Sequence, residues 1–510
     1  MTRRWSMATG LVLTTLSALG QLAVAAPGDQ PACVTVSGTV VYEASSVLTI
    51  DIAGPNGCGP AGTDYDRLSV TDLTLNGGTL AVRLAAGYVP GGGEVFDVLD
   101  WSNALTGAFG GFDFSQAVLL NGLSWDTSQV HVSGQIAVTG RIEIDSEPGL
   151  RHIVANAPAG TTARFAAALD GQALDLATPL VLSRDVTLSA ANLPHGVSLD
   201  GNHVSRVIHV ANGAKVTLEG ITVTRGAGGN GAGIENLGGD LTLVDVTLAD
   251  NHAAFYGGAL INLGGTVTVT GSTFANNSAG RSGGALYNGQ DPSAKVTLTN
   301  TTITGNHADG GGGGIYNYLG EVNLIHATLT RNSATNEGGG IQNAGGTVHI
   351  ENSIVAGNTA DVFAPDFRSN TPLDTAGANL IGDNSGTGTT FPAGPLVGTS
   401  PPSQLDAKLG PLADLGGPTP AIAPLAGSPA IDAAIVTALT PTTDQRGFAR
   451  NVDGDRQGGA APDLGAIETE PPPPPPVEQR SVPALPLALQ GLLGLLLVAA
   501  AGRAGRSRAR

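Results

Sequence analysis

A glycine-rich turn followed by an aliphatic residue, one further residue and an asparagine occurs five times within residues 231–358. Successive aliphatic positions are 26, 26, 29 and 26 residues apart, and a second asparagine ends each copy. A two-part pattern at a nearly constant period of this size is typical of a solenoid. The copies read GAGIEN, GGALIN, GGALYN, GGGIYN and GGGIQN, with the aliphatic residues Ile234, Leu260, Leu286, Ile315 and Ile341.

Apolar and polar residues alternate after each turn, which is the pattern of strands with one buried face. No segment of the repeat has helical spacing, and this excludes helical and leucine-rich repeats. A coil of about 26 residues with two or three short strands predicts an all-β chain folded as a single-stranded parallel β-helix, whose coils pair at ~4.8 Å. Two apolar columns are Leu241, Val267, Val296, Val322, Val348 and Leu243, Val269, Leu298, Leu324, Ile350.

Two columns of asparagine recur at the corners of the predicted coils. Asparagine tolerates the left-handed backbone region better than most residues, and stacked amides can hydrogen-bond along the axis as a ladder. We interpret both columns as structural rather than ligand-binding. The first is Asn236, Asn262, Asn288, Asn317 and Asn343; the second is Asn251, Asn277, Asn306, Asn332 and Asn358.

The GGA[IL] turn paired with FxxN resembles the repeat of polymorphic outer-membrane proteins and related adhesins, and residues 257–277 are the closest copy. The resemblance implies a right-handed β-helix displayed at a bacterial surface. We assign residues 150–358 to this β-helix. The pattern is specific for the fold and poorly specific for function.

The first 150 residues divide into a secretory signal and a β-rich domain. Arg3 and Arg4 precede an apolar run and an A-x-A cleavage pattern, so residues 1–25 are expected to be a signal peptide. Residues 30–145 contain alternating segments without the 26-residue period; the part from Tyr65 is similar to autotransporter-like exported proteins. We expect Cys33 and Cys58 to form a disulfide after export, which would stabilise the folded state by roughly 3 kcal/mol.

The excess of acidic residues limits the classes of molecule that this protein is expected to bind. The chain has 42 acidic and 24 basic residues, a net charge of −18. This argues against nucleic acid and anionic membrane surfaces as partners and favours a self-repelling surface protein.

Many parallel β-helix proteins cleave acidic polysaccharides, and they need catalytic or metal-binding residues to do so. The signatures of polygalacturonases are absent, and carboxylates do not stack in the regular coils. His252 and His307 each follow a ladder asparagine, but Ser278 occupies the coil between them, which predicts a separation too large for one metal ion. We therefore assign no catalytic, cofactor-binding or metal-ligating residue and expect no cofactor.

Residues 359–468 break the period. The motifs ANLIG, LGPLADLGGPTPAIAPLAGSPAIDAA, TDQRGFAR and DLGAIE resemble the choice-of-anchor Q domain, which follows β-helix repeats in exported proteins. This domain is expected to close the open end of the solenoid. Asp444 and Arg446 are expected to form a buried or half-buried ion pair, and the Asp453-Gly454-Asp455 sequence is a weak Ca²⁺ signal.

The C-terminal tail has three parts after a proline-rich spacer at residues 469–481. Residues 482–510 contain a short proline motif, an uncharged span at 484–502 and a basic end. The arrangement resembles IPTL-CTERM and PEP-CTERM sorting signals and implies an exosortase-type partner; the alternative is a permanent single-span anchor. The sorting residues are Val482, Pro483, Ala484, Leu485, Pro486, Arg503, Arg506, Arg508 and Arg510.

The sequence thus predicts an exported bacterial protein, secreted or held at the cell surface or outer membrane, with a structural or adhesive role. Its expected ligand is a glycan or a host or matrix surface. The alternative is a carbohydrate-active β-helix enzyme, a lyase or a hydrolase, with an unrecognised site. A group of carboxylates with a basic residue on one exposed face would favour the enzyme.

Overall fold

The computed structural model describes residues 31–58, 64–385, 391–399, 402–454 and 459–469, together with the short strands β1 (Leu16–Ser17) and β2 (Leu22–Ala23). The rest of the predicted signal peptide, Asp455, the proline-rich spacer and the sorting tail lie outside the described residues. The chain divides into two units, Met1–Glu470 and Pro471–Arg510, and the account below concerns the first.

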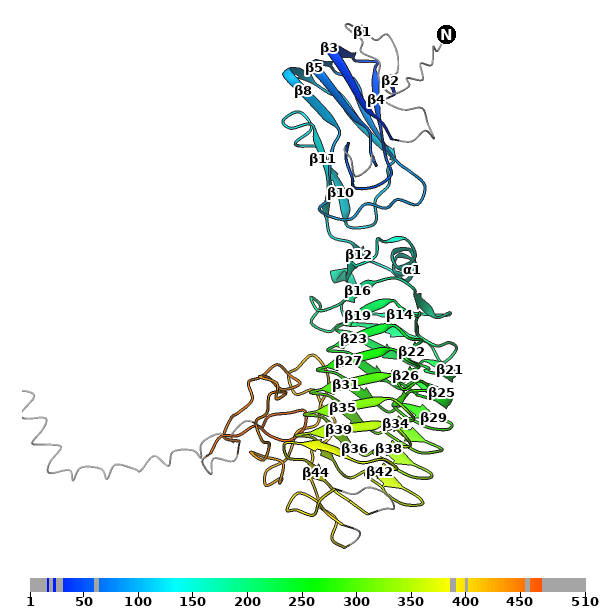
Figure 1. Ribbon diagram of the computed structural model, residues 1–510, viewed down its shortest axis with the longest axis vertical. Helices are drawn as coiled ribbons and strands as arrows, with labels where there is room; N and C mark the ends of the chain where they lie inside the picture. Colours follow the sequence, from blue (N-terminus) through cyan, green and yellow to red (C-terminus); the bar gives the residue numbers. More distant parts are fainter. Residues whose placement is uncertain are drawn as a thin grey trace, which may run out of the picture. The chain divides into compact units, whose positions relative to one another are not determined.

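The N-terminal domain is built mainly of parallel strands (Figure 1). One sheet has the order β1-β3-β5-β8 and the other has the order β2-β4-β6-β9, while β10-β11-β7 is antiparallel. The bounds are β3 Cys33–Glu43, β4 Val47–Ile52, β5 Arg67–Asn76, β6 Thr79–Leu84, β7 Val95–Asp97, β8 Leu99–Ala108, β9 Gly111–Gln116, β10 Leu123–Asp126 and β11 Gln135–Gly140.

This domain has its own hydrophobic core and a cross-link. Tyr42, Leu48 and Phe96 are among its fully buried side chains. The Phe114 and Trp125 rings stack on each other at 5.2 Å and pack against that core. A disulfide joins Cys33 to Cys58 with a Cα–Cα distance of 5.9 Å.

The β-helix begins earlier than its regular repeats. Helix α1 (Glu147–Asn156) follows β12, and Gly149 N donates a hydrogen bond to the N-cap Ser146 Oγ at 3.2 Å. Leu150 and Ile153 of α1 are buried in the same core that runs through the coils. Proline in its first turn and the serine cap explain why a helix starts here. A 3-10 turn at Ala167–Leu169 follows.

The solenoid has about eight turns of roughly 26 residues, as predicted. Each regular coil contributes one strand to each of four parallel sheets, in the chain order first, second, fourth and third. The first sheet contains β12 Glu143–Ile144, β13 Thr161–Phe165, β16 Val186–Ser189, β19 Lys215–Glu219, β23 Asp240–Val244, β27 Thr266–Thr270, β31 Lys295–Thr299, β35 Glu321–Ile325, β39 Thr347–Glu351 and β43 Asp374–Ala376.

The other three sheets run alongside it. The second contains β14 Ala173–Asp175, β17 Val197–Asp200, β20 Ile221–Thr224, β24 Thr247–Ala249, β28 Thr273–Ala275, β32 Thr302–Thr304, β36 Thr328–Thr330, β40 Ile354–Val355 and β44 Leu380–Ile381. The third contains β15 Leu180–Leu182, β18 Ile208–Val210, β22 Ile234–Asn236, β26 Leu260–Asn262, β30 Leu286–Asn288, β34 Ile315–Asn317, β38 Ile341–Asn343 and β42 Phe367–Ser369. The fourth contains β21 Ala227–Asn230, β25 His252–Tyr256, β29 Ser278–Ala279, β33 His307–Ala308, β37 Ser333–Ala334 and β41 Thr359–Ala360.

Like residues stack between coils, which confirms the predicted fold class. Val269 pairs in register with Leu298, and Leu298 pairs with Leu324. All three side chains are essentially fully buried in one continuous core. The glycine that opens each turn needs its lack of a side chain, because Gly257, Gly283 and Gly312 have φ of 64°, 73° and 65°.

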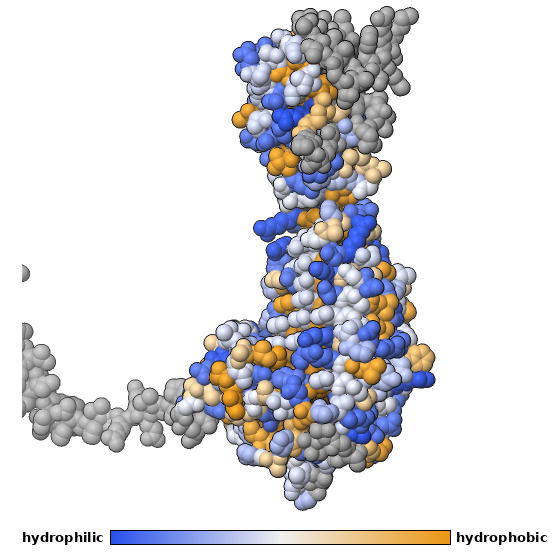
Figure 2. All heavy atoms as spheres, in the orientation of Figure 1, coloured by the Kyte–Doolittle hydropathy of each residue, from blue (hydrophilic) through white to orange (hydrophobic). Residues whose placement is uncertain are grey.

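The C-terminal region does not act as a simple end cap. Strands β41 to β44 complete one more coil, and Phe391 packs on Phe367 at 5.1 Å to join the core at that end. Residues 402–454 and 459–469, which we call the lateral segment, instead lie along the side of the coils (Figure 1). Hydrophobic residues gather on the surface of this segment (Figure 2). The described part of it contains no helix or named strand.

Candidate functional site

The two asparagine columns form buried ladders. In each, the Nδ2 amide of one asparagine donates to the Oδ1 of the asparagine in the next coil, at 2.8 to 3.0 Å. Asn262 and Asn306 show no exposed surface. In the second ladder, the backbone N–H of each asparagine also donates to the next side chain, as Asn277 N does to Asn306 Oδ1 at 2.9 Å. The side-chain amides hydrogen-bond to one another and to the backbone of the surrounding turns, so none of their donors or acceptors is left for a ligand.

The prediction that asparagine occupies these corners because it tolerates a left-handed backbone is wrong. None of the ladder asparagines has a positive φ, whereas the residue immediately before each asparagine of the second ladder does. That position holds Asp250, Asn276, Gly305, Arg331 and Gly357. Asparagine is therefore required in the ladder for its amide, and backbone tolerance matters one residue earlier.

Each ladder ends on a residue other than asparagine, which the repeat pattern did not predict. Asn343 Nδ2 donates to Ser369 Oγ at 3.0 Å, and Asn358 Nδ2 donates to Asp366 Oδ1 at 2.8 Å. Asp366 is 2% exposed and also accepts from the backbone N–H of Asp383 at 2.6 Å. Burial raises the pKa of the Asp366 carboxyl to about 7, although these hydrogen bonds oppose the shift.

The lateral segment binds the outward side of the second sheet. Thr302 Oγ1 donates to Gln445 Oε1 at 2.7 Å, and Gln445 Nε2 donates to Thr273 Oγ1 at 2.8 Å. Asn352 Nδ2 donates to Ile435 O at 2.8 Å. The two threonines, which face outward from their strands, are buried beneath the segment. The second sheet is therefore covered over these coils and is not available to a ligand.

The predicted ion pair lies in this segment. Arg446 Nη2 is 2.7 Å from Asp444 Oδ2, and the Asp444 side chain is completely buried. A second buried arginine, Arg450, lies 3.7 Å from Glu468 Oε2 and donates to Asn300 Oδ1 at 2.7 Å. Burial lowers the pKa of Arg450 to about 10, although neighbouring carboxylates oppose the shift.

His326 is buried against the same arginine. It occupies the corner position of Asn300 and Asn352 in the neighbouring coils, and all three have φ of 49°. Neither ring nitrogen of His326 makes a hydrogen bond of normal geometry with the described residues. Burial and the nearby Arg450 guanidinium lower the pKa of His326 to about 3, and the Asp463 and Gly465 carbonyls only partly oppose this.

The outward side of the third sheet differs from the rest of the coils. From His209 to Arg368, the strand pairings place the central positions in register, and all of them carry large polar or aromatic residues except Ile261. We call this set the tyrosine face. Its members are His209, Glu235, Ile261, Tyr287, Tyr316, Gln342 and Arg368.

Aromatic stacking organises the middle of the tyrosine face. Tyr287 and Tyr316 stack with ring centroids 5.4 Å apart and planes 10° apart. Tyr256, the last residue of β25, packs on Tyr287 at 4.9 Å, and Arg281 lies over the Tyr256 ring. Burial is the largest cause of the raised pKa of Tyr287 and Tyr316. Both hydroxyls therefore remain protonated at neutral pH and can donate hydrogen bonds.

Ion pairs occupy the two ends of the tyrosine face. Glu235 contacts Arg206 and, at 2.9 Å, His209 Nδ1. At the other end, Arg368 Nε donates to Glu337 Oε2 at 3.2 Å. Both carboxylates are thus paired with arginine.

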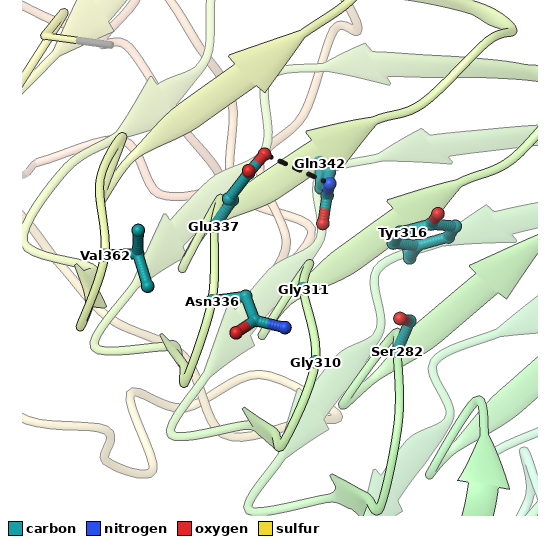
Figure 3. A pocket seen from close by; sticks show the side chains of 8 residues that line it. All are labelled: Ser282, Gly310, Gly311, Tyr316, Asn336, Glu337, Gln342 and Val362. Atoms are coloured by element: carbon teal, nitrogen blue, oxygen red, sulfur yellow. Dashed lines mark hydrogen bonds between the residues drawn. The ribbon is translucent and has the colours of Figure 1, made fainter. Parts of the chain in front are cut away.

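A hollow of about 290 Å³ opens beside Tyr316 (Figure 3). The lining residues come from four successive coils, and Gln342 Nε2 donates to Glu337 Oε2 at 3.4 Å across its upper edge. Most of the polar groups that line it are uncharged hydroxyls and amides. The full lining is Ser282, Gly310, Gly311, Tyr316, Asn336, Glu337, Gln342 and Val362.

The histidines considered as ligands do not converge. His252 Nδ1 contacts Ser278 Oγ at 2.8 Å, and His307 Nδ1 contacts Ser333 Oγ at 2.9 Å, so a serine lies beside each. The described residues contain no group of three or more histidine, cysteine, aspartate or glutamate side chains suited to a metal ion. The described part of the Asp453-Gly454-Asp455 sequence adds none.

One cluster does join two carboxylates and a base. His349 Nδ1 is 3.0 Å from Asp374 Oδ2, and His349 Nε2 is 3.3 Å from Glu351 Oε2. Glu351 is 2% exposed and also accepts a hydrogen bond from Thr437. The imidazole fills the space between the carboxylates, which a glycosidase leaves open for substrate or water.

Comparison with known proteins bears on the fold alone. A family model described as "Right handed beta helix region" matches residues 190–360. No curated protein matched the chain. The chain therefore contains a right-handed parallel β-helix, and its function must be argued from its surface. Within the described residues, no helix combines the length and apolar character that a membrane crossing needs.

Proposed function

We propose that this protein is exported to the bacterial cell surface through its C-terminal tail and serves there as a structural or adhesive β-helix scaffold. The observation that carries the proposal is the tyrosine face. It runs along successive coils, and the Tyr287–Tyr316 stack and the hollow give it the aromatic and polar groups that recognition surfaces use. Rigid strands hold those groups in place.

Export is supported by the disulfide between Cys33 and Cys58, because such bonds persist in oxidising compartments. The net charge of −18 also suits a protein that must stay unaggregated outside the cell. The sorting enzyme proposed as a partner would act on residues 482–510, which lie outside the described residues.

The enzyme alternative has one specific residue group in its favour, the His349 cluster. We rank it second because Glu351 is buried and His349 separates the carboxylates. It is tested by incubating the purified protein with pectin, alginate and neutral polysaccharides, with and without Ca²⁺. Product formation that is lost in His349→Ala but kept in the exposed-histidine control His252→Ala would overturn the ranking.

The surface proposal is tested on intact cells of the source bacterium. Antibodies against the β-helix should label intact cells, and a strain that lacks the protein should attach less to surfaces. A chain truncated after residue 481 should be released into the medium. Labelling that requires permeabilised cells would place the protein inside and contradict the proposal.

A further inference from the structure

We propose that the hollow beside Tyr316 is a subsite for one sugar residue of an uncharged polysaccharide. The chain would lie along the solenoid axis on the tyrosine face. The proposal names the ligand class of the adhesive surface and rests on the proposed function in that respect.

The hollow exists because one coil lacks side chains at two positions. The register of the fourth sheet continues beyond its paired strands, because Gly310 N donates to Arg281 O and Asn336 N donates to Gly310 O at 3.0 Å. The same register places Gly311 beside Ser282 and Glu337 of the neighbouring coils. Neighbouring coils thus form two walls, and the glycines form the floor. A Cβ added at Gly311 would lie 1.5 Å from Gln342 Oε1, so any side chain there would displace this lining group.

The groups around the hollow match the chemistry of a pyranose. A sugar ring has a C–H face that packs on an aromatic ring and an edge of hydroxyl groups. Tyr287 covers one face of the Tyr316 ring, and Tyr316 lines the hollow. Ser282, Asn336 and Gln342 supply hydroxyl and amide groups that both donate and accept hydrogen bonds.

Charge points to an uncharged ligand. Glu337 is the one carboxylate that lines the hollow, and it is engaged by Arg368. Neither of the nearby arginines lines the hollow: Arg281 lies over the Phe255 and Tyr256 rings, and Arg368 lies over the Phe363 ring. The lining thus places no cation against the carboxylates of an acidic polysaccharide, and the net charge of −18 disfavours its approach.

The architecture disfavours a peptide strand and favours a repeating ligand. In the coils around the hollow, strands β30, β34 and β38 are paired on both sides, so an extended peptide has no free sheet edge to join. Successive coils present successive positions at ~4.8 Å, close to the length of one sugar in an extended chain. A polysaccharide can therefore place neighbouring sugars over neighbouring coils.

The test is isothermal titration calorimetry of the purified full-length chain with cello-, xylo-, manno- and maltohexaose, and with oligogalacturonate as the acidic probe. At least one uncharged hexasaccharide should bind. Tyr316→Ala and Asn336→Ala should each weaken its binding at least tenfold, and Gly311→Leu should abolish it. The matched control is Tyr318→Ala, two residues from Tyr316 in the same coil and 43% exposed, which should bind as the parent does.

Three results of the titrations would contradict the proposed subsite. Absence of binding by every uncharged probe, tighter binding of oligogalacturonate, or unchanged affinity in Tyr316→Ala and Asn336→Ala would each overturn the subsite. Because Asn336 is exposed, its variant tests the subsite even if Tyr316→Ala fails to fold. Surface labelling of intact cells is a separate measurement, so failure of the subsite and failure of the proposed location are distinguishable.

Discussion

The side-chain amide of Asn358 donates to a carboxylate oxygen of Asp366 at 2.8 Å, so the second ladder ends on an acid instead of another amide. Above its raised pKa of about 7, the Asp366 carboxylate is ionised, only accepts hydrogen bonds and brings no donor that would need a further partner. It can therefore end a series of amides without leaving a buried group unsatisfied. The five asparagines and this acid behave as one hydrogen-bonded column.

Removing one member of that column should be costly. In Asn306→Ala, the buried backbone N–H of Asn277 loses its acceptor, and the Asn277 side-chain amide loses one of its two acceptors and keeps only Leu248 O. We expect a loss of roughly 2–5 kcal/mol in the free energy of unfolding. The outward-facing Asn323→Ala is the control and should cost less than about 1 kcal/mol. Chemical denaturation measures both, and equal losses would show that the ladder does not act as a unit.

The inside–outside register of the coils gives a second prediction. Leu298→Asp places a charge between Val269 and Leu324 in a fully buried column, and we expect it to destabilise the folded protein by more than about 4 kcal/mol. The adjacent Thr297→Asp points outward and should be mild. Thermal melting compares the two, and similar shifts would mean that the register is wrong.

A third prediction concerns acid stability. The folded pKa of His326 is about 3 and its ordinary value is 6.5, so the unfolded chain binds an extra proton between these pH values. Stability is therefore lost as pH falls below 6.5. At pH 5 this group should cost about 2 kcal/mol, a loss that His326→Asn should avoid.

Asparagine suits that position because Asn300 and Asn352 already hold it in the adjacent coils. The control is the exposed His252→Asn, which should follow the pH profile of the parent. Denaturation curves between pH 4 and 8 measure the effect. A stability difference between parent and His326→Asn that does not change with pH would contradict the burial argument.

The sequence predicted the coils because the same residue types recur at one spacing. Leu298 belongs to its apolar column in any alignment of the repeats. The lateral segment was beyond such reasoning, since Gln445 bonds to Thr302 across 143 residues with no periodicity. Thr302 faces outward from its strand, and only the lateral segment buries it. The hollow was missed because its cause is two absent side chains, at Gly310 and Gly311, within a run of glycines that the turn itself explains.

The tail supplies a fourth prediction. If residues 482–510 are a sorting signal, the mature protein should lack its last 25 or so residues, and Pro483→Ala should block their removal. Intact-mass measurement of protein isolated from the cell surface decides between the alternatives. Mature protein that retains Arg503 to Arg510, or a Pro483 variant trimmed as before, would indicate a permanent anchor.

Hydrogen bonds between neighbouring coils join residues close in the sequence, whereas those of the lateral segment join residues far apart. This difference determines which part of the protein can fold first. Asn262 meets Asn288 only 26 residues later, so each coil can dock on the one before it as the chain is made. Gln445, by contrast, must reach back 173 residues to the carbonyl of Ser272. The coils can therefore assemble one after another from the N-terminal side, and the lateral segment fastens them only after the last coil is complete. A chain that ends before residue 402 would still form the stacked coils, but it would lack the lateral segment that fastens them.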